Sequence, residues 1–368
     1  MKVRGHLVMI KYLLFSMLCL LPISVASAAP SITGISGTLT NGQTVSIAGS
    51  SFGTNAAAGT SNIEWLGGAS GPIQSGTVGA TFTRANWDAD WYDNDSTPSA
   101  PKKIANDQYH SGTKSLKVIV QPATLWDGVS SYKLPSPSNT VFISYWVRHD
   151  TSVTDGQWKM LRVSSAKTIV DGSAIAFFNW YGYQTLVEDT RIPQSDWVNQ
   201  NCFPAADNNW YRFDVWFNDT TITTTRWLSG SAPVSCTTTG PLNSTSGWNP
   251  LTASYIIWQD YIGNSQSNNS SATSIWQSDN YIQNGTQARV ELCDAATWAS
   301  AQHCEIQYPL SWNNTTIQVQ LNTGSFSSNA TAYLFAIDAS GNASAGQQIT
   351  IGSSGTSGNV VPNPPVLQ

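Results

Sequence analysis

The chain has 368 residues, with 17 Lys and Arg against 22 Asp and Glu, 16 Trp, and charged residues at only 11%. This length is enough for two or three domains, each with a core of its own. The aromatic content excludes a disordered chain, the scarcity of Lys, Glu and Leu excludes long helices and coiled coils, and the formal net charge of −5 argues against binding to nucleic acid or anionic membranes.

Residues 1–28 have the pattern of a secretory signal peptide. Basic residues at the start are followed by an apolar stretch over 12–25, and Ala-Ser-Ala at 26–28 fits a small-residue cleavage site. After this leader no stretch has the apolar length of a membrane span. The sequence therefore predicts a secreted protein, extracellular or at the cell surface, without a membrane span.

Short runs of alternating, β-branched and aromatic residues follow the leader, separated by Gly, Pro, Asn and Ser. None of them keeps helical periodicity for three turns, so the pattern predicts an all-β fold. The clearest predicted strands, in chain order, are 44–48, 115–120, 141–148, 158–163, 211–217, 222–227, 255–258, 288–292, 317–321, 332–337 and 348–351.

Charge divides the chain into a middle and two flanks. Every Lys and Arg after the leader lies between Arg84 and Arg289, so the two flanks share a composition that the middle lacks. We expect one domain to be split by another, because a guest domain with neighbouring termini is easily inserted at a loop. The predicted segments are 29–77 for the first half, 78–300 for the insert, 301–352 for the second half and 353–368 for a flexible tail. The alternative is two unrelated small β elements.

Both parts resemble known families. The segment PSITGISGTLTNGQTVSIAGSSFG, residues 30–53, resembles the opening of IPT/TIG immunoglobulin-like domains, and residues 312–326 with 332–352 are similar to their closing half. In the insert, YHSGTKSLKV, NNWYRFDVWF and DNYIQNGTQARVEL resemble strands of the concanavalin-like jelly rolls of lectins, glucanases and polysaccharide lyases. The resemblance implies a jelly-roll sandwich inserted into a smaller immunoglobulin-like sandwich.

Two predicted strands, 211–217 and 288–292, have alternate apolar side chains that we expect to face a core. On 211–217 the opposite face mixes aromatic and charged residues. Flat rings stack on sugars, while Arg, Asp and Glu bind their hydroxyls or carboxylates. We therefore expect a polysaccharide-binding groove formed by Trp146, Arg162, Trp210, Arg212, Asp214, Trp216, Arg289 and Glu291. In the alternative interpretation the charged residues form cross-strand pairs and many of the Trp belong to the core.

Two other functions remain as alternatives. A glycoside hydrolase is disfavoured, because the chain has four Glu and lacks the E-x-D-x-x-E strand of jelly-roll glucanases. A polysaccharide lyase acting on a uronate glycan needs a cation and a proton-transferring Tyr or His. The residues of these types are Arg148, His149, Tyr281 and Arg289, although the motifs of jelly-roll alginate lyases are incomplete. The third possibility is a structural adhesion or filament subunit.

Metal and disulfide sites are predicted from clustered side chains. The sequence predicts no required cofactor. Four carboxylates within eight residues are suited to binding Ca²⁺, namely Asp88, Asp90, Asp93 and Asp95. In the alternative interpretation these residues form a solvated loop. Four cysteines follow the leader and allow three pairings, of which proximity in the sequence favours Cys202–Cys236 with Cys293–Cys304. His110 is interpreted as a turn residue and His303 as a neighbour of the second disulfide.

Overall fold

The structure is a computed structural model that describes residues 28–68, 71–88, 101–120, 130–150, 157–167, 175–181, 184–189, 198–200, 208–218, 221–239, 252–262 and 272–355. The fold is all-β, as predicted, with three antiparallel sheets. Residues 1–27 of the predicted leader, most of the predicted Ca²⁺ cluster and residues 356–368 of the predicted tail lie outside the described residues, whereas Ser354–Gly355 at the start of that tail form a strand. No helix in the described part of the chain has the length and apolar character needed to cross a lipid bilayer.

Two sheets from the middle of the chain face each other. The first, called the central sheet below, has the strand order β15 (Val234–Thr239), β14 (Thr221–Leu228), β13 (Tyr211–Asn218), β8 (Thr140–His149), β17 (Thr273–Asn284), β6 (Ser115–Val120) and β5 (Lys103–Ala105), with β3 (Ile63–Trp65) also paired to β17. The second, the outer sheet, has the order β12 (Val198–Gln200), β11 (Gln184–Asp189), β10 (Ile175–Tyr181), β9 (Gln157–Ser164), β16 (Ala253–Ile262), β7 (Ser130–Ser138) and β4 (Trp87–Asp88).

The core of this larger sandwich follows from the alternation of side chains along its strands. In β13 every second residue, from Tyr211 to Phe217, is fully buried, and these side chains share one core with alternate residues of β8 and with apolar residues of β9 and β16. Burial of each large apolar side chain contributes about 1.5–3 kcal/mol. The opposite face of β13 and β8 therefore points away from the outer sheet.

A smaller sandwich combines strands from the two ends of the chain. Its strand order is β22 (Gln347–Thr350), β21 (Thr331–Ile337), β18 (Arg289–Cys293), β19 (Cys304–Trp312), β20 (Thr316–Gln320), β2 (Thr44–Ser50), β1 (Ser31–Thr38) and β23 (Ser354–Gly355). The first half of β19 pairs with β18 and the second half with β20. The sheet thus folds around β19, and its two halves enclose one core that includes Ile35, Val45, Leu292, Val319 and Leu334.

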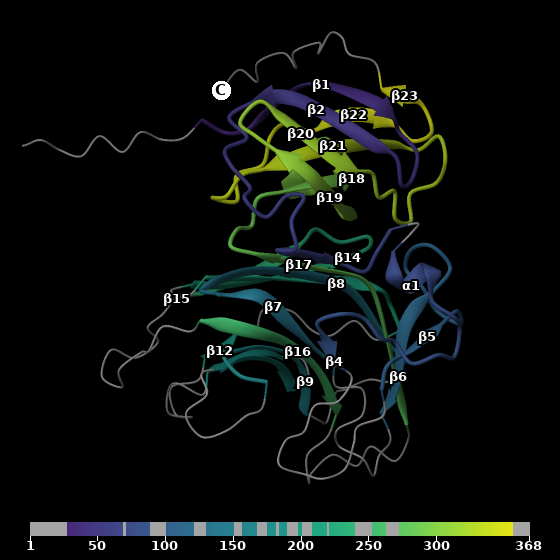
Figure 1. The fold of residues 1–368 in the computed structure, drawn as a ribbon, viewed down its shortest axis with the longest axis vertical. Coiled ribbons are helices and arrows are strands. Elements are labelled where there is room, and N and C mark those ends of the chain that lie inside the picture. The colour runs from purple at the N-terminus through teal and green to yellow at the C-terminus, as the bar shows by residue number, and fades with distance from the viewer. Residues whose placement is uncertain are drawn as a thin grey trace, which may run out of the picture.

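The small sandwich lies on the face of the central sheet that points away from the outer sheet. Figure 1 shows the purple and yellow strands of the small sandwich above β17, β8 and β14, with β7, β16 and β9 on the other side. The central sheet is consequently covered on both faces. A short helix, α1 (Pro72–Ser75), lies beside the central sheet next to β6.

The strands are placed differently from the predicted division of the chain. The strand β3, expected in the first half of the split domain, pairs with β17 of the central sheet. The strand β18, expected in the insert, pairs with β19 and β21 of the small sandwich. The turn at Gly285, which has φ of 92°, separates β17 from β18, so the segment DNYIQNGTQARVEL contributes to both sandwiches rather than to the jelly roll alone.

Candidate functional site at the junction of the two sandwiches

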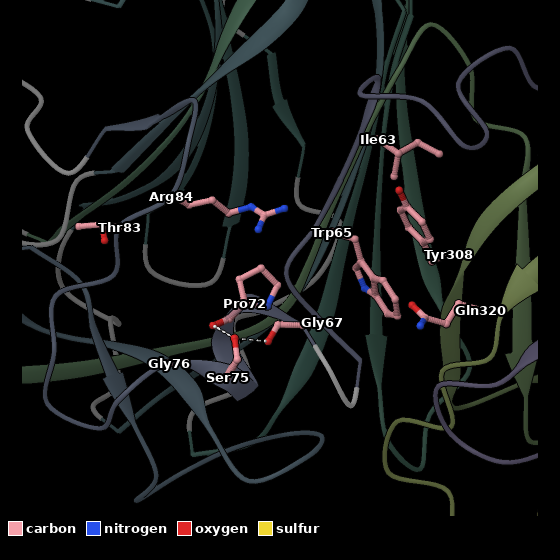
Figure 2. Close-up of a pocket in the computed structure, with 11 residues that line it drawn as sticks. Ile63, Trp65, Gly67, Pro72, Ser75, Gly76, Thr83, Arg84, Tyr308 and Gln320 are labelled. Carbon is pink, nitrogen blue, oxygen red and sulfur yellow. Dashed lines mark hydrogen bonds between the residues drawn. The ribbon is translucent and has the colours of Figure 1, made fainter.

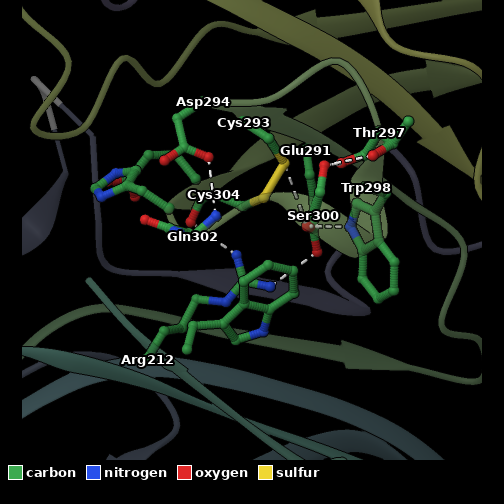
Figure 3. The surroundings of a disulfide bond; sticks show 12 residues. Arg212, Glu291, Cys293, Asp294, Thr297, Trp298, Ser300, Gln302 and Cys304 are labelled. Carbon is green, nitrogen blue, oxygen red and sulfur yellow. Dashed lines mark hydrogen bonds and ion pairs between the residues drawn. A yellow bond between two sulfur atoms is a disulfide. The ribbon is translucent and has the colours of Figure 1, made fainter. Parts of the chain in front are cut away.

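A buried ion-pair network joins the two sandwiches. Arg212 of β13 donates from Nη2 to Asp214 Oδ2 at 2.6 Å and to Glu291 Oε1 of β18 at 2.9 Å. Arg289 donates from Nε to the same Glu291 oxygen at 2.6 Å, and the Trp298 indole donates to Glu291 Oε2 at 2.8 Å. Figure 3 shows Arg212 reaching from the central sheet toward Glu291 and the neighbouring disulfide. Three donors therefore converge on one buried carboxylate.

The ionisation of this network is fixed by its opposite charges. Burial alone would raise the pKa of Glu291, but the guanidinium groups of Arg212 and Arg289 and the hydrogen bonds from Trp298 and Arg289 outweigh burial and hold that pKa at about 2. Burial would likewise lower the pKa of Arg212, yet the carboxylates of Asp214 and Glu291 raise it above its ordinary value. Glu291 and Arg212 are therefore charged at neutral pH.

The predicted groove is corrected by this geometry. Arg212, Asp214, Arg289 and Glu291 do come together, but each is at most 5% exposed and bonded to the others. The physical reason is that the small sandwich covers the face on which the groove was expected. The network therefore holds the two sandwiches together and offers no surface to a polysaccharide.

Of the other predicted groove residues, the three Trp also lie at the junction, whereas Arg162 lies elsewhere. Trp146 is 2% exposed and stacks on His110, with ring centroids 3.6 Å apart. Trp210 is half-buried and meets His110 edge-on, whereas Trp216 packs partly buried into the junction beside Phe142 and Tyr281. Arg162 is buried on β9 of the outer sheet and so belongs to a different sheet from the rest.

The four lyase candidates do not meet around an open cleft. Tyr281 is fully buried, donates to Gln283 Oε1 at 2.6 Å, and has a pKa that burial raises far above the usual range. His149 is buried and lies edge-on to Tyr211, while Arg148 is partly buried near the end of β8. Arg289 is held by Glu291 and lies over the Phe142 ring. As placed here, they do not form an acid–base site.

The disulfide between Cys293 and Cys304 is present, as predicted, and it links β18 to β19. Cys236 is also disulfide-bonded, and Cys202, its predicted partner, lies outside the described residues. Of the predicted Ca²⁺ cluster, Asp88 forms an ion pair with Lys167, and Asp90, Asp93 and Asp95 lie outside the described residues.

An open cleft lies at the edge of the junction. It has a volume of about 660 Å³ and is lined from the small sandwich by Tyr308 of β19 and Gln320 of β20. Its other walls come from β3, α1 and the segment before β4, with Trp65, Ser75 and Arg84 among the lining residues. Figure 2 shows Trp65, Tyr308 and Gln320 on one side and Arg84 pointing toward them from the other.

The cleft presents an aromatic wall opposite a cation. The rings of Trp65 and Tyr308 are stacked, with centroids 5.4 Å apart and planes 9° from parallel. Arg84 is 38% exposed, and its hydrogen-bond partner among the described residues is Glu64, which also accepts from the Trp87 indole at 3.1 Å. Burial and the charge of Glu64 raise the pKa of the Tyr308 hydroxyl, which therefore stays protonated.

Sequence reasoning missed both the cleft and a second cluster in the junction. His110, His303 and Glu305 offer donor atoms that all lie within 4.8 Å of one another, which is a spacing suited to a metal ion. Within the described ranges a second such group, Glu291 with Cys293 and Cys304, is not available to a metal because its sulfurs form the disulfide. His110 and His303 are far apart in the chain, so no local spacing pointed to their contact.

No family model matches the chain, and no curated protein matches it. Solved structures that it resembles include the cellulose-induced protein Cip1, with 14% identity, a TM-score of 0.37, and coverage of 53% of this chain and 89% of Cip1. A structure titled for endo-acting O-glycanases of the human gut microbiota has 11% identity, a TM-score of 0.42 and coverage of 61% and 98%. Alginate lyase A1-II', of polysaccharide lyase family 7, has 9% identity, a TM-score of 0.40 and coverage of 55% and 95%.

These three resemblances have TM-scores below 0.5 and each concerns about half of this chain, so they assign neither a fold family nor an activity to it. The resemblance of the small sandwich to IPT/TIG domains stays a prediction.

Proposed function

We propose that the protein is a secreted carbohydrate-binding protein whose binding site is the cleft between Trp65, Tyr308 and Arg84. The observation that carries this proposal is the pairing of a stacked aromatic wall with a partly exposed guanidinium across an open cleft. Aromatic rings supply apolar surface to the faces of a sugar ring, and Arg and Gln bind its hydroxyl or carboxylate oxygens. This keeps the predicted function and moves it to another site.

Secretion is part of the same proposal. The Cys293–Cys304 disulfide is typical of an oxidising compartment, and the predicted signal peptide points the same way. A polysaccharide lyase is not favoured by a specific observation, because its candidate residues do not share a cleft. Incubation with uronate polymers, followed by the absorbance of unsaturated products, tests that alternative separately.

A glycan array followed by calorimetric titration tests the binding site. We expect Trp65→Ala to weaken binding of the selected glycan by about 1–3 kcal/mol, because it removes half of the aromatic wall. Arg84→Ala should weaken it as well, and more strongly for a uronate than for a neutral sugar. Tyr109→Ala is the matched control, since Tyr109 is 45% exposed and does not line the cleft.

Circular dichroism establishes that each variant is folded before it is compared. Unchanged affinity in folded Trp65→Ala and Arg84→Ala variants would show that the cleft is not the binding site. Absence of binding to any glycan on the array would reject the function itself.

A further inference from the structure

Three side chains from both sandwiches come together at one point of the junction, and a fourth lies beside them. His110 lies in the segment between β5 and β6, and Asp279 lies at a bulge in β17, where the pairing with β8 shifts register. His303 directly precedes β19, and Glu305 is the second residue of that strand. The central-sheet sandwich thus supplies one imidazole and one carboxylate, and the small sandwich supplies the same pair.

The distances place these groups around a common centre. His303 Nε2 lies 2.8 Å from Glu305 Oε1, and His110 Nδ1 lies 3.7 Å from the same oxygen and 3.6 Å from Asp279 Oδ2. Ligands of a tetrahedral Zn²⁺ ion with bonds of about 2.0 Å are separated by about 3.3 Å. The observed spacings bracket that value.

One buried nitrogen of the cluster is left without a hydrogen bond. The His110 side chain is 7% exposed, and within the described part of the chain His110 Nδ1 has no hydrogen-bond partner. Its separations of 3.6 Å from Asp279 Oδ2 and 3.7 Å from Glu305 Oε1 are too long for hydrogen bonds, and Asp279 Oδ2 accepts from Ser111 and Ser278 instead. An unsatisfied buried nitrogen is costly, and a bound cation removes that cost by accepting its lone pair.

The surroundings hold the ligands in place. Trp146 stacks on the His110 ring with planes 11° from parallel, and Phe326 meets the His303 ring edge-on with centroids 4.8 Å apart. Gly324 has φ of 52°, and a Cβ there would lie 2.1 Å from the Glu305 carboxylate, so only glycine leaves room for that side chain. Ser111 donates to Asp279 Oδ2. Such outer contacts are what orients ligands in metal sites.

We propose that His110, His303 and Glu305, with Asp279 beside them, bind one divalent transition-metal ion of the Zn²⁺ class that bridges the two sandwiches. Imidazole nitrogen and carboxylate oxygen are the donors that Zn²⁺ takes in proteins, and a hard ion such as Ca²⁺ takes oxygen ligands instead. The site is separate from the carbohydrate cleft and does not depend on it. Its role is structural, because its ligands are buried and come from both sides of the junction.

Metal content and binding of the full-length protein test this proposal. After chelation and dialysis, the protein should bind one Zn²⁺ per chain by mass spectrometry of metals and by titration with Zn²⁺ alone, and saturation should raise Tm by about 5 °C. Ca²⁺ should not reproduce the shift. Glu305→Gln and His303→Asn should each weaken Zn²⁺ binding by at least tenfold. Asp107→Asn is the control, as it also changes a carboxylate to an amide but its side chain is 48% exposed and pairs with Lys117.

A measurement on the unmodified protein covers the case in which the variants do not fold. X-ray absorption of the Zn²⁺-loaded protein should show two imidazole ligands with the remaining ligands oxygen. A protein that takes up no Zn²⁺, a spectrum without imidazole, or a tight site that survives in folded Glu305→Gln and His303→Asn variants would overturn the proposal.

Discussion

Glu291 is the residue on which the junction depends most. It is fully buried, and its two oxygens accept from Arg212, Arg289 and Trp298. Arg212 also donates to the backbone carbonyl of Cys304 at 2.8 Å and lies over the Trp227 ring. Buried charges of this kind add little net stability compared with an apolar core, but removing one member leaves the others unpaired in a site from which water is excluded.

Replacing Arg212 by Met tests that statement. Asp214 and Glu291 would lose their shared partner, so we expect Arg212→Met to lower the free energy of unfolding by about 3–5 kcal/mol in urea denaturation. Lys117→Met removes the partly exposed pair with Asp107 and should cost about 1 kcal/mol or less. Equal losses in the two variants would contradict a structural role for the buried network.

The Glu291 carboxylate also makes the stability of the fold depend on pH. The pKa of Glu291 is about 2 in the folded protein against an ordinary value of 4.5, so its ionised form stabilises the fold above pH 4.5. That contribution, about 3 kcal/mol, is lost as the pH falls from 4.5 toward 2. Denaturation at several pH values should show this decline in the parent and a shallower one in Glu291→Gln. A decline of the same slope in both proteins would assign the acid sensitivity to other groups.

At the scale of the strands, the alternation of apolar and polar residues predicts burial correctly only where one face of a strand meets a core and the other does not. The pattern of β13 predicts its buried face correctly, from Tyr211 to Phe217. Alternation did not predict β17, although its end lies in the segment DNYIQNGTQARVEL that resembles jelly-roll strands. The reason is that polar residues such as Asn280 and Gln283 are buried on β17, where the Gln283 amide donates to the Ala288 carbonyl. A strand buried on both faces carries no period-two signal. The pattern of β18 predicts a strand but not the sandwich it joins, since that depends on distant partners.

The Cys293–Cys304 disulfide makes β18 and β19 a constrained hairpin. It closes a loop with a sequence separation of 11 residues, immediately beside His303 and Glu305. We expect the Cys293→Ala, Cys304→Ala double variant to unfold with a free energy about 2–4 kcal/mol lower than that of the oxidised parent. Urea denaturation without reductant measures the difference, and Cys236→Ala reports separately on the other disulfide. Equal stability of parent and double variant would mean that the bond constrains the unfolded chain little.

At the scale of the whole molecule, two sandwiches share one covered sheet. Composition indicated that the flanks belong together, because both lack Lys and Arg. It did not indicate that the small sandwich would cover the expected groove, nor that Trp65 and Tyr308 would meet in a cleft at the edge. Both outcomes depend on how two surfaces fit, which is not encoded in the pattern of any single strand.

Because the two sandwiches bury side chains against each other at the junction, we expect them to unfold together. The junction contains the ion-pair network and the ring cluster around Tyr281 and Ile306, so neither sandwich can unfold without exposing the other. Calorimetry should show one transition that coincides with the change in tryptophan fluorescence. Two well-separated transitions would indicate that the sandwiches are independent domains.

Because the small sandwich combines strands from both ends of the chain, its strands cannot all pair in the order in which they are synthesised. β1 and β2 are synthesised before the other strands of the small sandwich, yet β2 pairs with β20, and the Gln320 amide meets the Gly42 carbonyl across 278 residues. This hairpin therefore has one edge and one apolar face unpaired until β20 has been made. Pairing of β3 with β17 shortens the distance that remains, because the segment after β2 then meets the start of β18, where Asn55 donates to the Ala288 carbonyl at 2.7 Å. The first hairpin of the small sandwich is thus made early and secured late.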